Sequence, residues 1–440
     1  MWQEFDRVEK ESHFIPLTTF YVETFGCRSN QYDSQRLREA LQEVGLQGAS
    51  NTRNTDLIIV NTCTVTHTAS RKARRRLREL VRECPQSKVY ATGCYASADP
   101  EELGEIEGLA GVYGREQWEE LLEAATGEKA HDSRRVKGDF GIRSFTGRSR
   151  ALLKVQEGCD FFCAYCIVPF VRGEPRSRPL QEAVKEAQRL ISRGFREIVL
   201  TGIHLGLYGR DRPDDENLPN LVRSLADLPG LERLRLSSIE AVEVDELLLK
   251  AMEHPSVCQH LHLALQSGDD ETLERMGRRY TSADFMERVG MIRDHLENPA
   301  ISGDVIVGFP GETDKAFAKT MEVCRKVAFS RMHIFRYSVR PGTRAAEMPG
   351  QVHSRTAKKR SKQLRKLARQ LSQEWAEQFV GRNVRVLLEE QKAPNCFTGY
   401  TDRYVRAEVR GQGSTDQVRH AEIRSARNSK LQGDLIELQS

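Results

Sequence analysis

The chain has 440 residues, of which 30% are charged and 39% are hydrophobic, so it is long enough for about three domains. No stretch approaches the roughly 20 apolar residues that a membrane helix needs, and the first residues lack the apolar segment of a signal peptide. We therefore expect a cytoplasmic protein without a membrane partner. The net charge of +4 is too small to indicate a nucleic-acid partner by itself.

Basic residues are concentrated in two segments. Residues 71–82 contain seven basic side chains and one acid, and residues 355–369 contain eight and no acid. Such clusters neutralise RNA phosphates, although each is equally consistent with a solvated helix face. If they do bind RNA, we expect the contacts to include Arg74, Arg75, Lys359 and Arg360.

The N-terminal part alternates strand and helix patterns, which predicts a doubly wound α/β domain over residues 18–127. The expected strands are 18–25, 56–61 and 89–92, and the expected helices are 34–44, 67–83 and 116–125. Residues 128–149 are polar and lack periodicity, which is typical of a linker.

A longer series of strands and helices follows and predicts a partial or closed parallel barrel over residues 145–378. The expected strands are 152–156, 197–202, 233–238, 260–265, 302–308 and 331–337, with helices near 180–193, 217–227, 243–253, 282–296 and 313–328 and a basic helix at 354–378. In residues 379–440, short strand-like segments alternate with glycine-containing turns, so we expect a small antiparallel β-barrel there.

The cysteines give the clearest chemical signal. Ten cysteines in a cytosolic chain indicate metal binding or catalysis rather than disulfides. Cys159, Cys163 and Cys166 form a Cys-x3-Cys-x2-Cys run directly after an expected strand. Three thiolates can hold a [4Fe–4S] cluster and leave one iron open, since such clusters normally take four. A structural zinc ion is the alternative, but it needs four ligands, and no fourth cysteine or histidine lies in this loop.

Three further cysteines each follow an expected strand of the N-terminal domain. They are Cys27, Cys63 and Cys94. Because the carboxyl ends of parallel strands meet at one edge of a sheet, we expect these thiols to converge there. Three converging thiols would suit a second [4Fe–4S] cluster with one open iron; the alternative is three unrelated loop cysteines.

The run at Cys159, after the first strand of a six-unit barrel, resembles that of the radical S-adenosylmethionine (SAM) enzymes. Together with the N-terminal cysteines, the chain resembles the methylthiotransferases over nearly its whole length. Residues 25–32, 200–206 and 397–402 are similar to the branch of this family that acts on N6-threonylcarbamoyladenosine in tRNA. The resemblance implies a cluster-binding N-terminal domain, a radical SAM (β/α)6 barrel and an OB-like TRAM domain that binds RNA.

The resemblance also implies cofactors and contacts. It implies two [4Fe–4S] clusters and two SAM per turnover, one to methylate a cluster-bound sulfur and one to generate a radical. Candidate SAM contacts are Tyr165, Gly202, Ser237, Glu240, Gln266 and Val307. The C-terminal candidates for RNA contact are Tyr400 and Arg403. No catalytic residue is expected beyond the cluster ligands.

The expected reaction is methylthiolation of C2 of N6-threonylcarbamoyladenosine next to the tRNA anticodon, with a reductant such as flavodoxin or ferredoxin. An aromatic C–H has no useful acidity, so acid–base catalysis is the wrong chemistry and a radical is needed. Three alternatives stay open. They are methylthiolation of isopentenyladenosine in tRNA, methylthiolation of a ribosomal-protein aspartate, and a zinc-dependent RNA-binding protein without enzyme activity.

Overall fold

The structure is a computed structural model that describes residues 18–127 and 141–437. The N-terminal region is a parallel sheet in the order β2-β1-β3-β4-β5, which confirms the doubly wound prediction. Its strands are β1 (Thr19–Thr24), β2 (Gln47–Gly48), β3 (Leu57–Thr62), β4 (Lys88–Gly93) and β5 (Gly111–Val112). Its helices are α1 (Arg28–Glu43), α2 (His67–Glu83), α3 (Cys94–Ala98), α4 (Pro100–Gly104) and α5 (Trp118–Thr126).

Helices cover both faces of this sheet because its central strand is apolar on both sides. Leu57 and Ile59 of β3 pack with α1 and α5, whereas Ile58 and Val60 pack with α2, α3 and α4. Helix α1 begins at Arg28, six residues before the predicted start. Its first turn is polar but buried against the strand ends, so tertiary contacts override weak helix propensity.

The middle of the chain is a partial barrel of parallel strands arranged in two sheets, β10-β9-β6 and β11-β12-β13-β14. Its strands are β6 (Arg150–Lys154), β9 (Glu197–Thr201), β10 (Arg233–Leu236), β11 (Ser238–Ile239), β12 (His260–Gln266), β13 (Ala300–Val307) and β14 (Arg331–Arg336). The predicted strand 233–238 is therefore divided between the two sheets, and β14 is a sheet edge.

Amphipathic helices cover the barrel and bury leucine-rich faces against the strands. They are α8 (Leu180–Ser192), α9 (Leu218–Ala226), α10 (Glu246–Met252), α11 (Asp270–Met276), α12 (Ser282–His295) and α13 (Asp314–Val327). Shorter elements are β7 (Gln156–Glu157), α7 (Val168–Arg172), β8 (Arg176–Ser177), η1 (Leu205–Leu207), η2 (Ala241–Glu243) and α14 (Arg344–Glu347). The long basic helix is α15 (Ser354–Glu377).

The C-terminal region is a closed barrel in the order β15-β16-β17-β19-β18. Its strands are β15 (Asn383–Ala393), β16 (Cys396–Thr401), β17 (Arg406–Arg410), β18 (Val418–Arg427) and β19 (Lys430–Ile436). The barrel was predicted to be antiparallel, but β17 and β19 pair in parallel and close it. Closure leaves no free edge strand.

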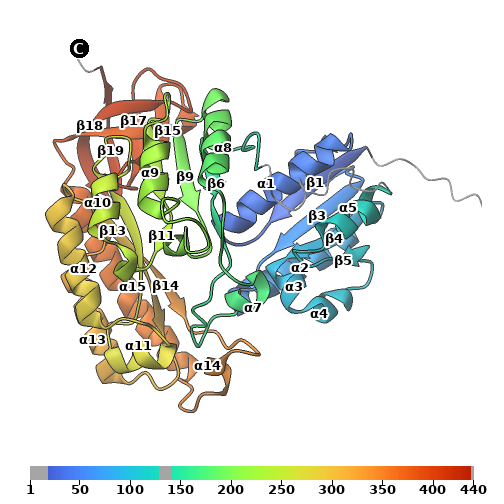
Figure 1. The fold of residues 1–440 in the computed structure, drawn as a ribbon, viewed down its shortest axis with the longest axis horizontal. Helices are drawn as coiled ribbons and strands as arrows, with labels where there is room; N and C mark the ends of the chain where they lie inside the picture. Colours follow the sequence, from blue (N-terminus) through green and yellow to red (C-terminus); the bar gives the residue numbers. More distant parts are fainter. Residues whose placement is uncertain (1–17, 128–140, 438–440) are drawn as a thin grey trace, which may run out of the picture.

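Figure 1 shows the N-terminal sheet beside the parallel barrel, with α7 between them, and the C-terminal barrel against the amino ends of the parallel strands. Buried Arg233 and Arg235 of β10 donate to backbone carbonyls of the C-terminal barrel and fix it there. Of the predicted linker, residues 128–140 lie outside the described residues, and residues 141–149 contain no helix and only bends and turns before β6. None of the helices in the described ranges is long and apolar enough to cross a membrane.

Candidate functional site

Three cysteines meet at the carboxyl edge of the N-terminal sheet. Cys27 follows β1 and precedes α1, Cys63 follows β3, and Cys94 begins α3 directly after β4. Burial, together with the neighbouring Cys94 and Cys27, raises the pKa of Cys63 to about 11. A positively charged iron cluster would supply the stabilisation that these thiolates lack. We call these three residues the N-terminal trio.

Two glycines let the chain make this close approach. Gly26 has φ +109°, and a Cβ there would lie 3.0 Å from the Cys63 sulfur. Gly93 has φ +94°, and a Cβ there would overlap Asn61 and the backbone of Thr62. Both backbone conformations favour glycine, so glycine is required directly before Cys27 and directly before Cys94.

The second set of thiols lies in one loop of the parallel barrel, between β7 and α7. The backbone N–H of Cys166 donates to the Cys163 carbonyl at 2.9 Å, and that of Cys159 donates to the Gly173 carbonyl at 3.0 Å. Burial raises the pKa of Cys159 to about 11 and that of Cys166 to about 12. We call Cys159, Cys163 and Cys166 the barrel trio.

The spacing of the thiols goes against a single metal ion. In the described part of the chain, only His262, Asp304 and His333 bring three ligand atoms within 4.8 Å of one another. The thiolates around one zinc ion lie about 4 Å apart, since Zn–S bonds are about 2.3 Å long. Both cysteine trios are more open than this. They fit a larger cluster better than they fit zinc.

Arg172 at the end of α7 connects the N-terminal trio to the parallel barrel. Its Nε donates to the Cys94 sulfur at 3.3 Å, its Nη1 donates to Glu157 at 2.7 Å, and its Nη2 donates to Asn30. The side chain is only 2% exposed. The loop that carries the barrel trio is thus anchored on a cysteine of the N-terminal trio.

A buried ionic network surrounds this connection. Lys154, the last residue of β6, pairs with Asp33 of α1 and with Glu157, the latter at 2.8 Å. Arg115 also contacts Glu157, at 3.0 Å. Burial raises the pKa of Asp33, but Lys154, Arg115 and Arg172 outweigh it and hold that pKa below its ordinary value. The network fixes the N-terminal sheet against the parallel barrel.

The six candidate SAM contacts all lie at the carboxyl end of the parallel barrel. Tyr165 is in the cysteine loop, Gln266 and Val307 end β12 and β13, and Gly202, Ser237 and Glu240 directly follow β9, β10 and β11. The side chain of Val307 is fully buried in the core, which leaves only its backbone to face a cofactor. Contact of these residues with SAM stays a prediction.

Two residues beside the barrel trio had no predicted role. Arg278 lies 3.5 Å from the Cys163 sulfur and 3.5 Å from the Tyr165 hydroxyl, and it pairs with Glu240. His204 lies 3.5 Å from the Cys159 sulfur. Arg278 has no sequence signal of its own, whereas His204 lies within residues 200–206, which resemble the threonylcarbamoyladenosine branch. Arg172 lies six residues after Cys166, in the segment 168–173 that follows the cysteine loop.

The candidate RNA contacts differ in their surroundings. Arg75 and Lys359 are exposed, whereas Arg74 pairs with Glu102. Arg360 is buried and pairs with Glu312 at 2.7 Å and Asp314 at 2.8 Å. Its guanidinium holds α15 against the start of α13. This placement corrects the expectation that Arg360 is available to RNA.

The two C-terminal candidates lie where the C-terminal barrel meets the parallel barrel. The Tyr400 ring stacks on Tyr404 with centroids 4.9 Å apart. The Arg403 guanidinium donates to the backbone carbonyls of Asn298 at 3.3 Å and Glu297 at 3.1 Å. Arg403 therefore holds the two barrels together, and its contact with RNA stays a prediction.

Two families match this chain. Residues 19–114 match the family described as uncharacterized protein family UPF0004, and residues 153–324 match the radical SAM superfamily. The second match implies SAM and a [4Fe–4S] cluster as cofactors. The structure of TsrM from Kitasatospora setae, a radical SAM methyltransferase with cobalamin and a [4Fe–4S] cluster bound, is similar in fold alone. Its TM-score is 0.56 at 17% identity, covering 76% of this chain and 77% of that one.

Curated relatives match almost the full length. The threonylcarbamoyladenosine tRNA methylthiotransferase MtaB of Bacillus subtilis is 36% identical over 411 residues, covering 90% of this chain and 91% of that protein. The protein of the same name from Thermotoga maritima is 34% identical, covering 96% and 98%. A tRNA-2-methylthio-N(6)-dimethylallyladenosine synthase of Jannaschia sp. is 35% identical, covering 94% of each. The chain therefore belongs to the radical SAM tRNA methylthiotransferase family.

Proposed function

We propose that this enzyme methylthiolates C2 of N6-threonylcarbamoyladenosine next to the anticodon of tRNA, using two [4Fe–4S] clusters and two SAM per product. The observation that carries the proposal is the pair of three-cysteine sites, with Arg172 linking Cys94 of the first site to Glu157, which precedes the cysteine loop of the second. Each site offers three thiols, so each would leave one iron of a four-iron cluster free of protein ligands.

The two cysteine trios would have different roles. The barrel trio would hold the cluster that binds SAM, and the N-terminal trio would hold the second cluster. A cluster with SAM supplies one-electron chemistry strong enough to remove hydrogen from an aromatic carbon. The protein's part is to hold both sites at a fixed separation, which the buried network of Lys154, Asp33 and Glu157 does, and to keep water out.

The substrate assignment is supported by the relatives. The proteins from B. subtilis and T. maritima are named for threonylcarbamoyladenosine. The Jannaschia protein, at nearly the same identity, is named for dimethylallyladenosine and keeps that nucleoside as the second candidate. A ribosomal-protein aspartate is the more distant alternative.

We propose a matching division of the chain. Residues 18–127 bind the second cluster, residues 145–378 bind SAM, and residues 379–440 bind RNA together with the exposed basic faces of α2 and α15. A flavodoxin or ferredoxin would supply the electron, and the cytoplasm is the compartment where such a reductant and tRNA meet. RNA affinity from these surfaces would fall with salt, because phosphate contacts dominate it.

Nucleoside analysis tests this function. A strain that lacks the gene is complemented with the wild type, Cys63→Ala, or Cys84→Ala as a control at a half-buried cysteine outside both trios. We expect 2-methylthio-N6-threonylcarbamoyladenosine with the wild type and the control, and none with Cys63→Ala. Recovery of 2-methylthio-isopentenyladenosine alone, or of a methylthiolated ribosomal protein alone, would replace the proposal by the corresponding alternative.

A further inference from the structure

Four arginines surround one tyrosine ring where the three regions of the chain meet. Tyr404 lies in the turn between β16 and β17 of the C-terminal barrel. The distances from guanidinium carbon to ring centroid are 4.8 Å for Arg235, 5.3 Å for Arg150, 5.9 Å for Arg28 and 5.9 Å for Arg331. We call these four residues the arginine cluster. Arg28 belongs to the N-terminal region, and the others belong to the parallel barrel.

The charge of the arginine cluster is only partly balanced. Glu197 pairs with Arg235 at 2.7 Å, and Glu389 pairs with Arg150 at 2.7 Å. Within residues 18–127 and 141–437, no carboxylate pairs with Arg28 or Arg331. Burial lowers the pKa of Arg28, and its hydrogen bond goes to the Tyr404 hydroxyl at 3.3 Å. Two guanidiniums therefore lack a counter-charge.

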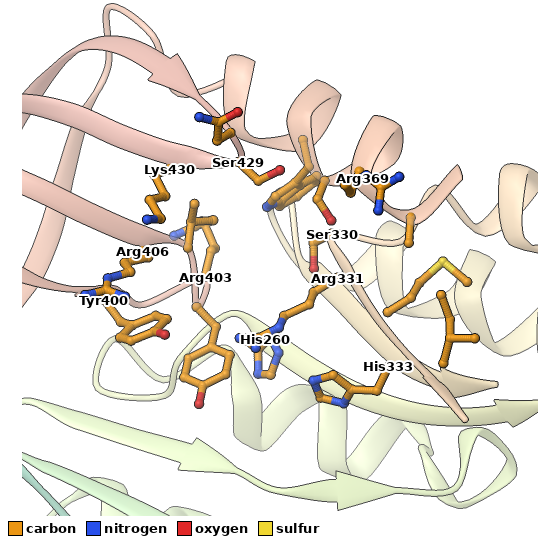
Figure 2. A pocket seen from close by; sticks show the side chains of 18 of the residues that line it. His260, Ser330, Arg331, His333, Arg369, Tyr400, Arg403, Arg406, Ser429 and Lys430 are labelled. Atoms are coloured by element: carbon orange, nitrogen blue, oxygen red, sulfur yellow. The ribbon is translucent and has the colours of Figure 1, made fainter. Parts of the chain in front are cut away.

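Two cavities lead to this place. One, of about 630 Å³, is lined by Arg331, His260 and Tyr404, and Figure 2 shows Arg331 directed toward His260 across it. The other, of about 580 Å³, is lined by Arg28, Arg150 and Tyr404. A ligand that enters either cavity can reach unpaired guanidinium groups.

The arginine cluster lies at the opposite end of the barrel from the barrel trio. Arg150 and Arg331 are the first residues of β6 and β14, whereas Lys154, beside the ionic network, is the last residue of β6. The strand rises about 13 Å between Arg150 and Lys154. Arg28 directly follows Cys27 of the N-terminal trio. The cluster thus lies at the amino end of the parallel barrel, which we call its floor, about one strand length from the barrel trio and beside the start of α1.

We propose that the arginine cluster binds an anionic group of the RNA substrate, and that this group is the carboxylate of the N6 substituent. The proposal rests on the proposed function and deepens it. C2 and the exocyclic N6 both lie on the Watson–Crick edge of adenine, with N1 between them. A base with C2 at the trios would therefore start its N6 substituent close by, within reach of Arg28, which directly follows Cys27. Guanidinium groups bind carboxylates with paired hydrogen bonds.

This floor also explains how one family scaffold selects among substituents. An uncharged dimethylallyl group would displace water from the half-buried Arg28 and the exposed Arg331 and return no hydrogen bond to either guanidinium. A carboxylate provides the missing counter-charge. Discrimination between the two N6 substituents would therefore come from the arginine cluster. It would not come from the cysteines that bind iron and sulfur, because these would act on both kinds of substrate.

Binding of anticodon stem-loops to the full-length protein tests the inference. The stem-loops carry threonylcarbamoyladenosine, its methyl ester, isopentenyladenosine or plain adenosine, and fluorescence anisotropy gives the Kd. The variants are Arg331→Gln, Arg331→Lys and the control Arg336→Gln, which is exposed on the other face of β14. We expect the wild type and the control to prefer the carboxylate over its methyl ester by about tenfold or more, Arg331→Lys to keep part of this preference, and Arg331→Gln to lose it.

Two results would overturn the inference. An equal loss of affinity for all four stem-loops in Arg331→Gln would mean that the cluster binds a backbone phosphate. An unchanged preference for the carboxylate would mean that recognition lies elsewhere. Nucleoside analysis of the wild type distinguishes failure of this inference from failure of the proposed function. If the wild type forms the methylthiolated product and the preference persists in Arg331→Gln, only the inference fails; if it forms no product, the proposed function fails and the inference with it.

Discussion

The two cysteine trios are built in different ways. The barrel trio comes from one loop, and its backbone is held by short-range hydrogen bonds such as that from Cys166 to Cys163. The N-terminal trio is collected from three strand ends that only the order β1-β3-β4 makes adjacent. The first site is a local property of the sequence, and the second is a property of the sheet. A defect in the packing of the N-terminal region should therefore damage one site and spare the other.

Each trio nevertheless has one arginine against one of its sulfurs. Arg172 lies 3.3 Å from Cys94, and Arg278 lies 3.5 Å from Cys163. Arg278 comes from the same barrel as its cysteine, whereas Arg172 reaches across from the barrel to the N-terminal sheet. The N-terminal site thus depends on domain docking in a way that the barrel site does not.

The largest effect should come from removing one ligand of each trio. Cys63→Ala should retain SAM cleavage in the dithionite-reduced protein but lose methylthiolation, and Cys163→Ala should lose both. Iron analysis should give about eight irons in the wild type and about four in either variant, since each trio would bind one four-iron cluster. Parallel loss of iron and SAM cleavage in both variants would show that the two sites are not independent.

Substitution of Arg172 or Arg278 should have a smaller effect, a shift in the reduction potential of the neighbouring cluster. Hydrogen bonds to cluster sulfurs and nearby positive charge favour the reduced state, so removing either arginine should lower a reduction potential by on the order of tens of millivolts. EPR-monitored titrations read each cluster alone: Arg172→Gln in a Cys163→Ala background, and Arg278→Gln in a Cys63→Ala background.

The exposed Arg176 at the start of β8 provides the control, as Arg176→Gln should shift neither potential. Arg172→Gln is also measured in the Cys63→Ala background, where only the barrel cluster remains. A shift of the barrel cluster there would show that Arg172 acts on both sites, against the difference between the two arginines described above.

The smallest effect concerns Tyr404 and the arginine cluster. Burial raises the pKa of Tyr404, but Arg28, Arg150 and Arg235 outweigh it and lower that pKa to about 8. As the pH rises through about 8, the phenolate adds a negative charge that competes for the arginine cluster. The groups that face its ring are Arg28, Arg150, Arg235, Arg331, His260 and Tyr400.

We therefore expect the preference for the carboxylate-bearing stem-loop to fall a few-fold above that pH in the wild type. In Tyr404→Phe the preference should stay constant over the same range. Phenolate absorbance measured in parallel reports the titration itself. A preference that falls equally in both proteins would assign the pH dependence to another group.

Much of this protein could be predicted from sequence because the signals are local. The spacing of Cys159, Cys163 and Cys166 and the strand–cysteine pattern at Cys63 and Cys94 depend on residues close together in the chain. Strand and helix positions followed from apolar periodicity, which the cores of the N-terminal sheet and the parallel barrel confirm. The start of α1 and the division of the strand at 233–238 were missed, since both depend on distant contacts.

The tertiary structure alone decided which charged side chains are available. Arg360 lies in a basic run but is buried in an ion pair with Glu312, whereas Arg331, which carries no sequence signal, lines a cavity. Arg28, Arg331 and Tyr404 come from three separate regions of the chain, and only domain docking brings them together. The sequence directly shows where charged residues lie and how apolar residues repeat along a short segment. Whether a charged side chain is buried or paired depends on which distant segments pack against it.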